Sequence, residues 1–266
     1  MKNLVLLLFV LMVSGTQRLF AYDTFTIDTA RVSIYYRFEY ETDTISHLKK
    51  NDVLALQIGQ NYTAFFSPYT LEFYTTKKPV SYKGKVAADL PASTVVNYYL
   101  YSNLKTKMIE HLESIAYRYW TFTEKQPQFD WKILPDTMHV AGYLCQKAEC
   151  DYSGRHWIAW FSPDIPLNYG PYKFSGLPGL IMKIEDSSRH YCFEAAYIDE
   201  EPAPMLRMDV KTQSVSKQHL FQEKHKYLKN RFKYTDMVWG VDNSHLGTPK
   251  DSHIDPLERD AEFIKE

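Results

Sequence analysis

The residues of this chain that could carry out chemistry are scattered, and they form no known catalytic motif. Nine histidines are spread along the chain, and the closest pair, His219 and His225, is six residues apart, which is wrong for one face of a helix. Nucleophile elbows, HExxH zinc motifs, phosphate loops and dinucleotide fingerprints are missing from the sequence. Four carboxylates could act as acids and bases, or could be ordinary charges of turns and strand edges: Asp164, Glu185, Asp186 and Glu194. We therefore expect no catalytic residues, no metal site and no cofactor.

Two cations beside aromatic residues are the better candidates for binding. Arg155 follows Gly154 at a predicted hairpin turn, and Lys173 lies between Tyr172 and Phe174. If these residues line a cavity, the two cations could bind an acidic headgroup or a peptide carboxylate. The alternative for Arg155 is an ion pair with a structural carboxylate.

An uncharged hexapeptide follows these residues: Gly176-Leu177-Pro178-Gly179-Leu180-Ile181. Its glycines supply backbone freedom, its proline fixes one φ angle, and its last residues begin an apolar run typical of a buried strand. One interpretation is a turn into that strand, in which Gly176 or Gly179 adopts a positive φ or allows close backbone packing. The other is a mobile lip over an apolar pocket. A valine at position 179 should unfold the protein under the first interpretation and change only ligand binding under the second.

The chain has three cysteines, Cys145, Cys150 and Cys192. In an oxidising compartment one pair could form a disulfide. Cys145 and Cys150 are five residues apart and would point to opposite faces of one strand, so we prefer the pair Cys150–Cys192. Three separate buried thiols are the alternative.

The pattern of the first half predicts strands, a hairpin and one helix. The strands are expected at residues 32–40, 53–58 and 62–67, with a tight turn at 59–61. Apolar residues at intervals of four, four, four and three favour a helix over residues 95–119, capped by Ser93 or Thr94. A strand remains an alternative for the tyrosine-rich start of this segment, and a strand at 117–122 should follow.

The second half returns to a strand pattern and ends in a helix. Strands are expected at residues 129–133, 140–150, 156–162, 179–186 and 190–198, with a turn at 186–189. A basic helix should begin at Ser216 and run to about residue 232, its lysines facing either solvent or an anionic partner. Residues 240–266 are expected to be a loosely packed tail.

The N-terminus predicts export. Lys2 precedes an apolar run at residues 4–13, and small residues lead to Ala21, so we expect a signal peptide over residues 1–21. The alternative is an uncleaved anchor, but the run is far shorter than the roughly 20 residues that cross a bilayer. We expect one domain at residues 22–239, in the periplasm, at the outer membrane or outside the cell, without a later transmembrane segment. The formal net charge of −1 gives no field that would attract nucleic acid.

Several short elements, in a fixed order, resemble those of a known family. They are LQIG at 56–59, AGYLCQKA at 141–148, GR at 154–155, AW at 159–160, IP at 165–166, GPYKF at 170–174, the hexapeptide at 176–181 and DPLE at 255–258. Together they resemble the GLPGLI family of secreted bacterial proteins, whose biochemical activity is not established. The resemblance implies a mainly β fold with helices (α+β), in which a curved antiparallel sheet or half-barrel has helices on its concave side, similar to lipoprotein carriers of the LolA type. Cys150 and Cys192 lie outside the shared elements.

These features together favour a non-enzymatic exported protein. We expect it to bind a hydrophobic or amphipathic small molecule or lipid, or an envelope partner such as an outer-membrane transporter. One alternative is a structural protein of the envelope that acts through strand edges, which an exposed flat edge strand would favour. Another is an unrecognised hydrolase or peptidase accessory, which three or more titratable groups converging in one cavity would favour.

Overall fold

The computed structural model describes residues 22–43, 47–76, 96–116 and 118–229 of the 266-residue chain. These residues are mostly strands, with two helices. The strands are β1 (Asp23–Ala30), β2 (Val32–Asp43), β3 (Leu48–Ile58), β4 (Tyr62–Phe66), β5 (Tyr98–Asn103), β6 (Met108–Ile115), β7 (Arg118–Lys125), β8 (Lys132–Val140), β9 (Tyr143–Tyr152), β10 (Arg155–Ser162), β11 (Leu180–Asp186), β12 (Tyr191–Asp199), β13 (Ala203–Asp209) and β14 (Thr212–Ser214). The helices are α2 (Pro68–Thr76) and α3 (Lys217–Lys229).

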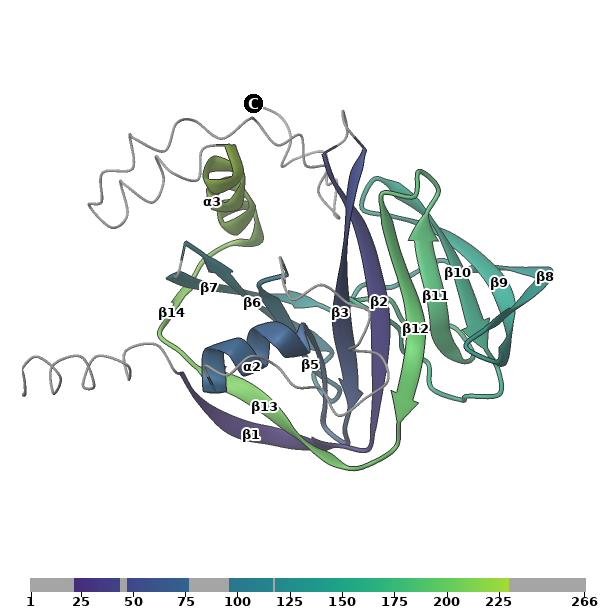
Figure 1. Cartoon of the computed structure of the whole chain (residues 1–266), viewed down its shortest axis with the longest axis horizontal. Helices are drawn as coiled ribbons and strands as arrows, with labels where there is room; N and C mark the ends of the chain where they lie inside the picture. The colour runs from purple at the N-terminus through teal and green to yellow at the C-terminus, as the bar shows by residue number, and fades with distance from the viewer. Residues whose placement is uncertain (1–21, 44–46, 77–95, 117, 230–266) are drawn as a thin grey trace, which may run out of the picture.

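Twelve strands form one large sheet in the order β14-β7-β6-β5-β4-β3-β2-β12-β11-β10-β9-β8 (Figure 1). Strand β14 runs parallel to β7, and the other neighbours are antiparallel. Strands β2 to β7 follow one another in chain order, as do β8 to β12, and the pairing of β12 with β2 joins these two halves. The edge strands β8 and β14 do not pair with each other in the described part of the chain, so the sheet is open rather than a closed barrel.

The main core lies on one face of this sheet, where the loop between β10 and β11 packs against both halves. Phe174 of this loop contacts Trp157 of β10, with ring centroids 4.7 Å apart. Tyr172 contacts Tyr98 of β5, with ring centroids 5.9 Å apart. The Gln126 side chain, just after β7, donates a hydrogen bond of 2.7 Å to a backbone carbonyl of the same loop. Because one loop contacts β5, β7 and β10, the sheet must curve around it, and we call this side the concave face.

A two-stranded ribbon, β1 with β13, covers part of the opposite face (Figure 1). Met205 and Met208 of β13 are fully buried and belong to a second core cluster with Tyr99 and Tyr101 of β5. At the rim of this contact, Arg207 of β13 pairs with a glutamate of β6 at 2.7 Å. The ribbon therefore fixes the convex side of β5 and β6 and leaves their concave side to other groups.

The helix predicted for residues 95–119 is wrong, because this stretch forms β5 and β6. At the turn between them, the Asn103 side chain accepts hydrogen bonds from the backbone N–H groups of Lys105 at 3.0 Å and Thr106 at 2.9 Å. Intervals of four between apolar residues are also multiples of two, so a strand satisfies them as well as a helix does. Tyr99 and Leu100 lie on opposite faces of β5 and are each only 1% exposed, because both faces of the sheet are covered here.

Most other predicted strands are confirmed, with shifts of a few residues. The turn at 59–61 joins β3 to β4, and the turn at 186–189 joins β11 to β12. The strand predicted at 140–150 corresponds to β9, which begins at Tyr143, whereas the one predicted at 129–133 overlaps β8 only at Lys132 and Ile133 and misses most of that strand. Strands β1, β13 and β14 and helix α2 are not predicted by the sequence pattern.

Helix α3 confirms the predicted basic helix within the described residues. The Ser216 hydroxyl accepts a hydrogen bond of 3.1 Å from the backbone N–H of His219, the geometry of an N-cap. The end of that prediction at 230–232, the caps Ser93 and Thr94, the signal peptide at 1–21 and the tail at 240–266 lie outside the described residues.

The predicted disulfide Cys150–Cys192 is wrong, and all three cysteines are free thiols. Cys150 lies on β9 and Cys192 on β12, and β10 and β11 run between them. Three steps between strands span about 14 Å, whereas the Cα atoms of a disulfide lie within about 7 Å. Burial raises the pKa of the Cys150 thiol to about 12, so it is unreactive.

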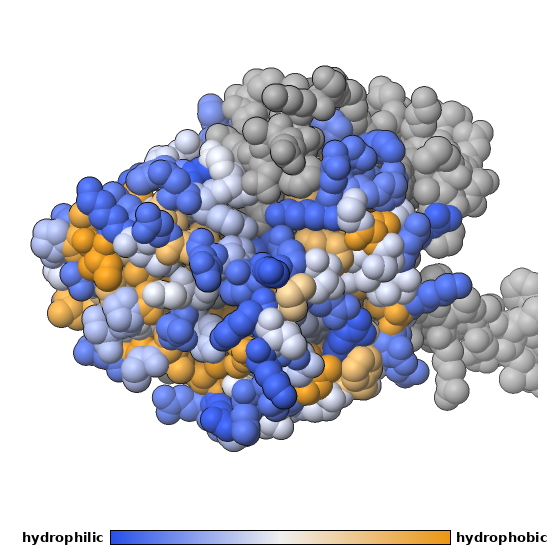
Figure 2. All heavy atoms as spheres, turned by 180° about the vertical axis from the view of Figure 1, so that it is seen from behind, coloured by the Kyte–Doolittle hydropathy of each residue, from blue (hydrophilic) through white to orange (hydrophobic). Residues whose placement is uncertain are grey.

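The β8–β9 hairpin carries exposed apolar side chains. Ile133 is 45% exposed, Tyr143 38% and Leu144 48%. Figure 2 shows apolar atoms gathered on the side of the molecule where this hairpin lies. Neither described helix is long and apolar enough to cross a membrane.

Candidate functional site

The hexapeptide at 176–181 is a turn that leads into β11. Gly176 has a φ of +94°, in the left-handed region that favours glycine. A Cβ atom on Gly179 would lie 2.2 Å from the carbonyl oxygen of Ser162 in β10, so only glycine permits this approach of the two strands. Leu177, Leu180 and Ile181 are buried in the main core. This geometry matches the first interpretation, a turn into a buried strand.

Arg155 forms the structural ion pair that was its alternative interpretation. Its guanidinium group lies 2.8 Å from the carboxylate of Asp186, and both side chains are at most 2% exposed. The guanidinium also lies 4.8 Å from the ring centre of Tyr191, whose backbone N–H donates to Asp186 at 2.8 Å. Arg155 thus ties the β9–β10 hairpin to the turn between β11 and β12.

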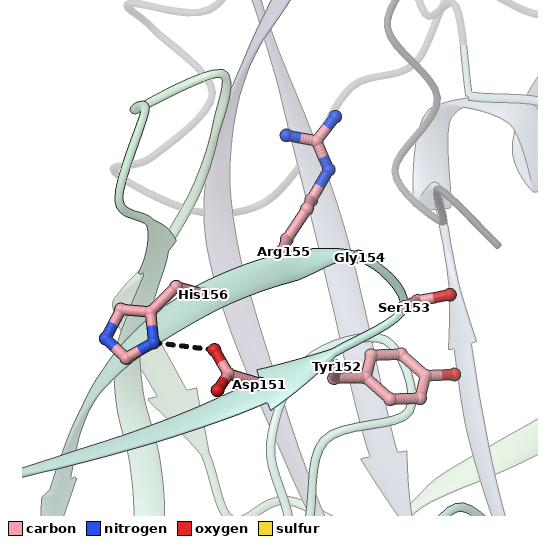
Figure 3. A pocket seen from close by; sticks show the side chains of 6 residues that line it. All are labelled: Asp151, Tyr152, Ser153, Gly154, Arg155 and His156. Atoms are coloured by element: carbon pink, nitrogen blue, oxygen red, sulfur yellow. Dashed lines mark hydrogen bonds and ion pairs between the residues drawn. The ribbon is translucent and has the colours of Figure 1, made fainter. Parts of the chain in front are cut away.

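A hollow of about 340 Å³ lies beside this arginine, at the tip of the β9–β10 hairpin (Figure 3). It is lined by residues 151–156, and His156 and Asp151 on its wall are joined at 2.8 Å. In Figure 3 the Arg155 side chain points away from this pair, which matches its burial against Asp186. The hollow is therefore formed by one hairpin, and although Arg155 is among its lining residues, its guanidinium group is bound to Asp186 instead.

Lys173 lies on the concave face with no exposed side-chain area. Its ammonium group pairs with Glu124 of β7 and lies 4.8 Å from the ring centre of Tyr172 and 5.9 Å from that of Phe122. Glu124 also pairs with Lys217 of α3 at 3.2 Å. One carboxylate of the sheet thus holds both an interior lysine and a lysine of the helix.

A second shared carboxylate lies on the neighbouring strand. Glu113 of β6 is 3.1 Å from Nε2 of His111 on the same strand and 2.7 Å from the ammonium group of Lys224 on α3. His111 and Glu113 are 3% and 5% exposed. The His111 ring stacks on Phe122 at 4.7 Å and lies 5.6 Å from Tyr98. We call the six titratable residues of the two sets the concave cluster: His111, Glu113, Glu124, Lys173, Lys217 and Lys224.

Helix α3 covers this cluster with one side. Lys217 and Lys224 are seven residues apart, which places them on one face of the helix. Between them Leu220 is fully buried against a small apolar cluster that includes Trp120 and Phe122. Ion pairs of Lys217 and Lys224 and the apolar contacts around Leu220 therefore attach this face of α3 to β6 and β7.

Burial and the lysines set the protonation of the pair His111–Glu113. Burial lowers the pKa of His111, against the effect of Glu113, so the imidazole is neutral near pH 7. Burial alone would raise the pKa of Glu113, but Lys224 and His111 lower it to about 2, so the carboxylate is ionised. Nδ1 of His111 is buried and has no hydrogen-bond partner in the described part of the chain.

Of the site residues predicted from sequence, the structure brings Lys173, Tyr172 and Phe174 together and places Arg155 elsewhere. The sequence prediction missed His111, Glu113 and Glu124. The alternation of His111 and Glu113 on one strand face is a usable signal, but only once residues 108–115 are known to be a strand. Among the described residues, no three His, Cys, Asp or Glu side chains are placed to hold a metal ion.

Comparisons with known proteins bear on the fold rather than on an activity. A family model described as "Protein of unknown function (Porph_ging)" matches residues 152–183, from the hairpin hollow through the hexapeptide into β11. Two crystal forms of a protein named PNGF-II, in space groups P21 and C2, are similar at TM-scores of 0.50 and 0.51 and 12% identity. The match covers 74% of this chain and 33% or 32% of the other, so this chain spans about a third of the length of that protein. No curated protein sequence matches. The chain therefore shares a local sequence pattern with an uncharacterised family and its fold with part of PNGF-II.

Proposed function

We propose that this chain is an exported, non-enzymatic binding protein of the cell envelope that takes an amphipathic ligand on its concave face, beneath α3. The signal peptide at 1–21, a single domain at 22–239 and membership of the GLPGLI family belong to this proposal. The ordered sequence elements support the family, and the residues matched by the Porph_ging model, 152–183, are those that hold the GR, AW, IP, GPYKF and hexapeptide elements. We extend the comparison with LolA-type carriers only to shape, namely a curved sheet with a helix on its concave side.

The observation that carries the proposal is a buried polar group without a partner inside an otherwise paired cluster. Burying a polar atom without a hydrogen bond costs about 1–3 kcal/mol, and Nδ1 of His111 has no partner among the residues that the structure describes. Aromatic rings of Tyr98, Tyr172 and Phe122 lie around the cluster, which offers apolar contact beside polar groups. A polar group with apolar walls is the arrangement expected of a site for an amphipathic molecule.

Native mass spectrometry of the mature protein, purified gently from its own envelope fraction, tests this function. We expect a bound mass that disappears on extraction with organic solvent. The variant Glu113→Gln should lower the bound fraction, because it weakens the groups that hold His111. Glu110→Gln is the matched control, since Glu110 lies on the opposite face of the same strand and pairs with Arg207. A bare monomer, or equal loss in both variants, would contradict the proposal.

A partner protein at the β8–β9 hairpin is the second candidate, favoured by the exposure of Ile133, Tyr143 and Leu144. Strand β8 is irregular between Ile133 and Thr137 and contains Pro135, which cannot donate a backbone hydrogen bond. Contact would therefore use side chains rather than an added strand. A photo-crosslinking residue at position 144 should capture an envelope protein such as an outer-membrane transporter. The same residue at Tyr197, 49% exposed on β12, is the control, and equal capture at both positions would count against this candidate.

The alternative of a hydrolase is favoured by one feature, the gathering of titratable side chains in the concave cluster. Hydrolysis needs a nucleophile or an activated water beside the base. The groups described in contact with His111 are Glu113, Tyr98 and Phe122, and none of these is a serine, threonine or cysteine. The geometry therefore supports binding better than nucleophilic catalysis.

A further inference from the structure

The concave cluster restricts the chemistry of a ligand through the tautomer of His111. Because Glu113 is ionised and lies 3.1 Å from Nε2, Nε2 carries the proton and donates to the carboxylate. Nδ1 then carries a lone pair and can only accept a hydrogen bond. A ligand group that meets His111 must therefore bring a proton of its own.

The cations of the concave cluster are already paired. Lys173 and Lys217 are held by Glu124, and Lys224 is held by Glu113. A carboxylate or phosphate ligand would have to displace one of these glutamates, and at His111 it would bring a second lone pair towards Nδ1. An anionic head is therefore disfavoured in this site.

A cationic head is disfavoured by the charge of the cluster. It contains three lysines and two glutamates beside a neutral histidine. Lys173 and Lys224 create a positive potential at His111, because both lower the pKa of its imidazole. An added ammonium group would meet repulsion from both.

We propose, resting on the ligand-binding function above, that the polar end of the ligand is a neutral hydroxyl group that donates a hydrogen bond to Nδ1 of His111. The apolar part of the ligand lies against the aromatic rings of Phe122, Tyr98 and Tyr172. His111 is then the residue that selects an alcohol over an acid of the same length.

Access to this site requires movement of α3. The described face of the helix is attached through Lys217, Lys224, Leu220 and the apolar side chains around Leu220. When α3 lifts away, Glu113 loses Lys224 but gains contact with water, so the carboxylate is not left buried and unpaired. Release of α3 therefore costs mainly the burial of Leu220 and its apolar neighbours.

Matched probes of one chain length test the hydroxyl group directly. We would titrate the purified full domain at pH 8 with 1-dodecanol, dodecanoate and dodecylamine, following tryptophan fluorescence, to which Trp120 beside Leu220 should contribute. We expect dodecanol to bind about tenfold more tightly than either charged probe, because dodecanol donates a hydrogen bond to His111 whereas the charged probes bring an unfavourable charge into the site. His111→Phe should remove this preference, and His139→Phe, an exposed histidine on β8, should not.

A measurement without mutation covers the case in which His111→Phe does not fold. In protein labelled with ¹⁵N-histidine, dodecanol should shift the Nδ1 resonance of His111 and leave its Nε2 resonance nearly unchanged. Binding of dodecanoate as tight as that of dodecanol, or no shift at Nδ1, would overturn the hydroxyl assignment and leave the binding function standing. Binding of none of the three probes would overturn the amphipathic-ligand function itself, and the hydroxyl assignment with it.

Discussion

Replacement of Gly179 by alanine should destabilise the protein far more than a single methyl group normally does. The added Cβ would lie 2.2 Å from the Ser162 carbonyl oxygen and 2.7 Å from its carbonyl carbon, whereas ordinary contact begins near 3.4 Å. Both obstructing atoms are backbone, so no side chain can rotate away. Strands β10 and β11 must separate locally by about 1 Å, a shift typical of an overpacked core.

The cost can be estimated from the groups that this separation disturbs. Overpacking of this kind costs about 1–3 kcal/mol. The start of β11 is held by hydrogen bonds from the backbone N–H groups of Leu180 and Ile181 to the loop, both 2.9 Å, and each is worth about 1 kcal/mol. Alanine returns about 0.4–1 kcal/mol by restricting the unfolded chain. The expected loss is therefore about 2–4 kcal/mol, or about 5–15 °C in Tm for a domain of this size.

Thermal and urea unfolding followed by circular dichroism would measure this loss. Gly142→Ala is the control, because an added Cβ there meets no atom within 4 Å, although Gly142, unlike Gly179, has a positive φ of +86°. It should cost only the backbone strain, about 1 kcal/mol. If Gly179→Ala melts no lower than Gly142→Ala, the close approach of β10 and β11 is refuted. A normal melt with altered ligand binding would instead support the lip interpretation of the hexapeptide.

Three further predictions concern charge and thiols. Because burial lowers the pKa of His111, the unfolded chain binds that proton at a higher pH than the folded chain does, so the free energy of unfolding should fall as pH drops below about 6.5. Glu113 should lower the free energy of unfolding further between pH 4.5, its ordinary pKa, and about pH 2, its pKa in the folded protein. Urea unfolding at a series of pH values measures both effects. If the His111→Phe variant keeps the same dependence of stability on pH just below 6.5, the prediction for His111 is contradicted. Arg155→Met should cost about 3–5 kcal/mol by leaving a buried carboxylate unpaired, and adding Asp186→Asn, which still accepts from the amide of residue 191, should recover more than half; equal stability of the single and double variants would argue against the pair. Alkylation after denaturation without reductant should add three labels in a mass spectrum, and a single label would reveal a disulfide.

Much of the strand content could be predicted from the sequence because it follows from local alternation. The turns at 59–61 and 186–189 have residue types that few other structures accept. The prediction of a helix at 95–119 fails for a local reason. Apolar residues four apart fit the period of a strand as well as that of a helix. Because both faces of the sheet are buried here, the strands lack the alternating polar residues that would have distinguished them from a helix. Strand β1 escapes prediction because its residues are mostly exposed or half-buried, so it lacks a clear apolar face.

The candidate site could be predicted only in part, because its members meet through the fold. Tyr172, Lys173 and Phe174 are adjacent in sequence, and their aromatic and cationic types are visible there. Glu113 and Lys224 are far apart in sequence, and nothing local indicates that one lies 2.7 Å from the other. Pairing of Arg155 with Asp186 depends likewise on which strands become neighbours.

The pairing of β12 with β2 has a consequence for how the chain reaches its native state. Tyr191 lies opposite Tyr40, about 150 residues away along the chain. While the polypeptide is being made from its N-terminus, β2 must wait with one bare edge until almost the whole sheet has followed it. Contacts that close so large a loop form late and slow folding, and an unpaired strand edge invites association with other chains during the delay. The joint between the two halves of the sheet is therefore where a chaperone would be most useful to this protein.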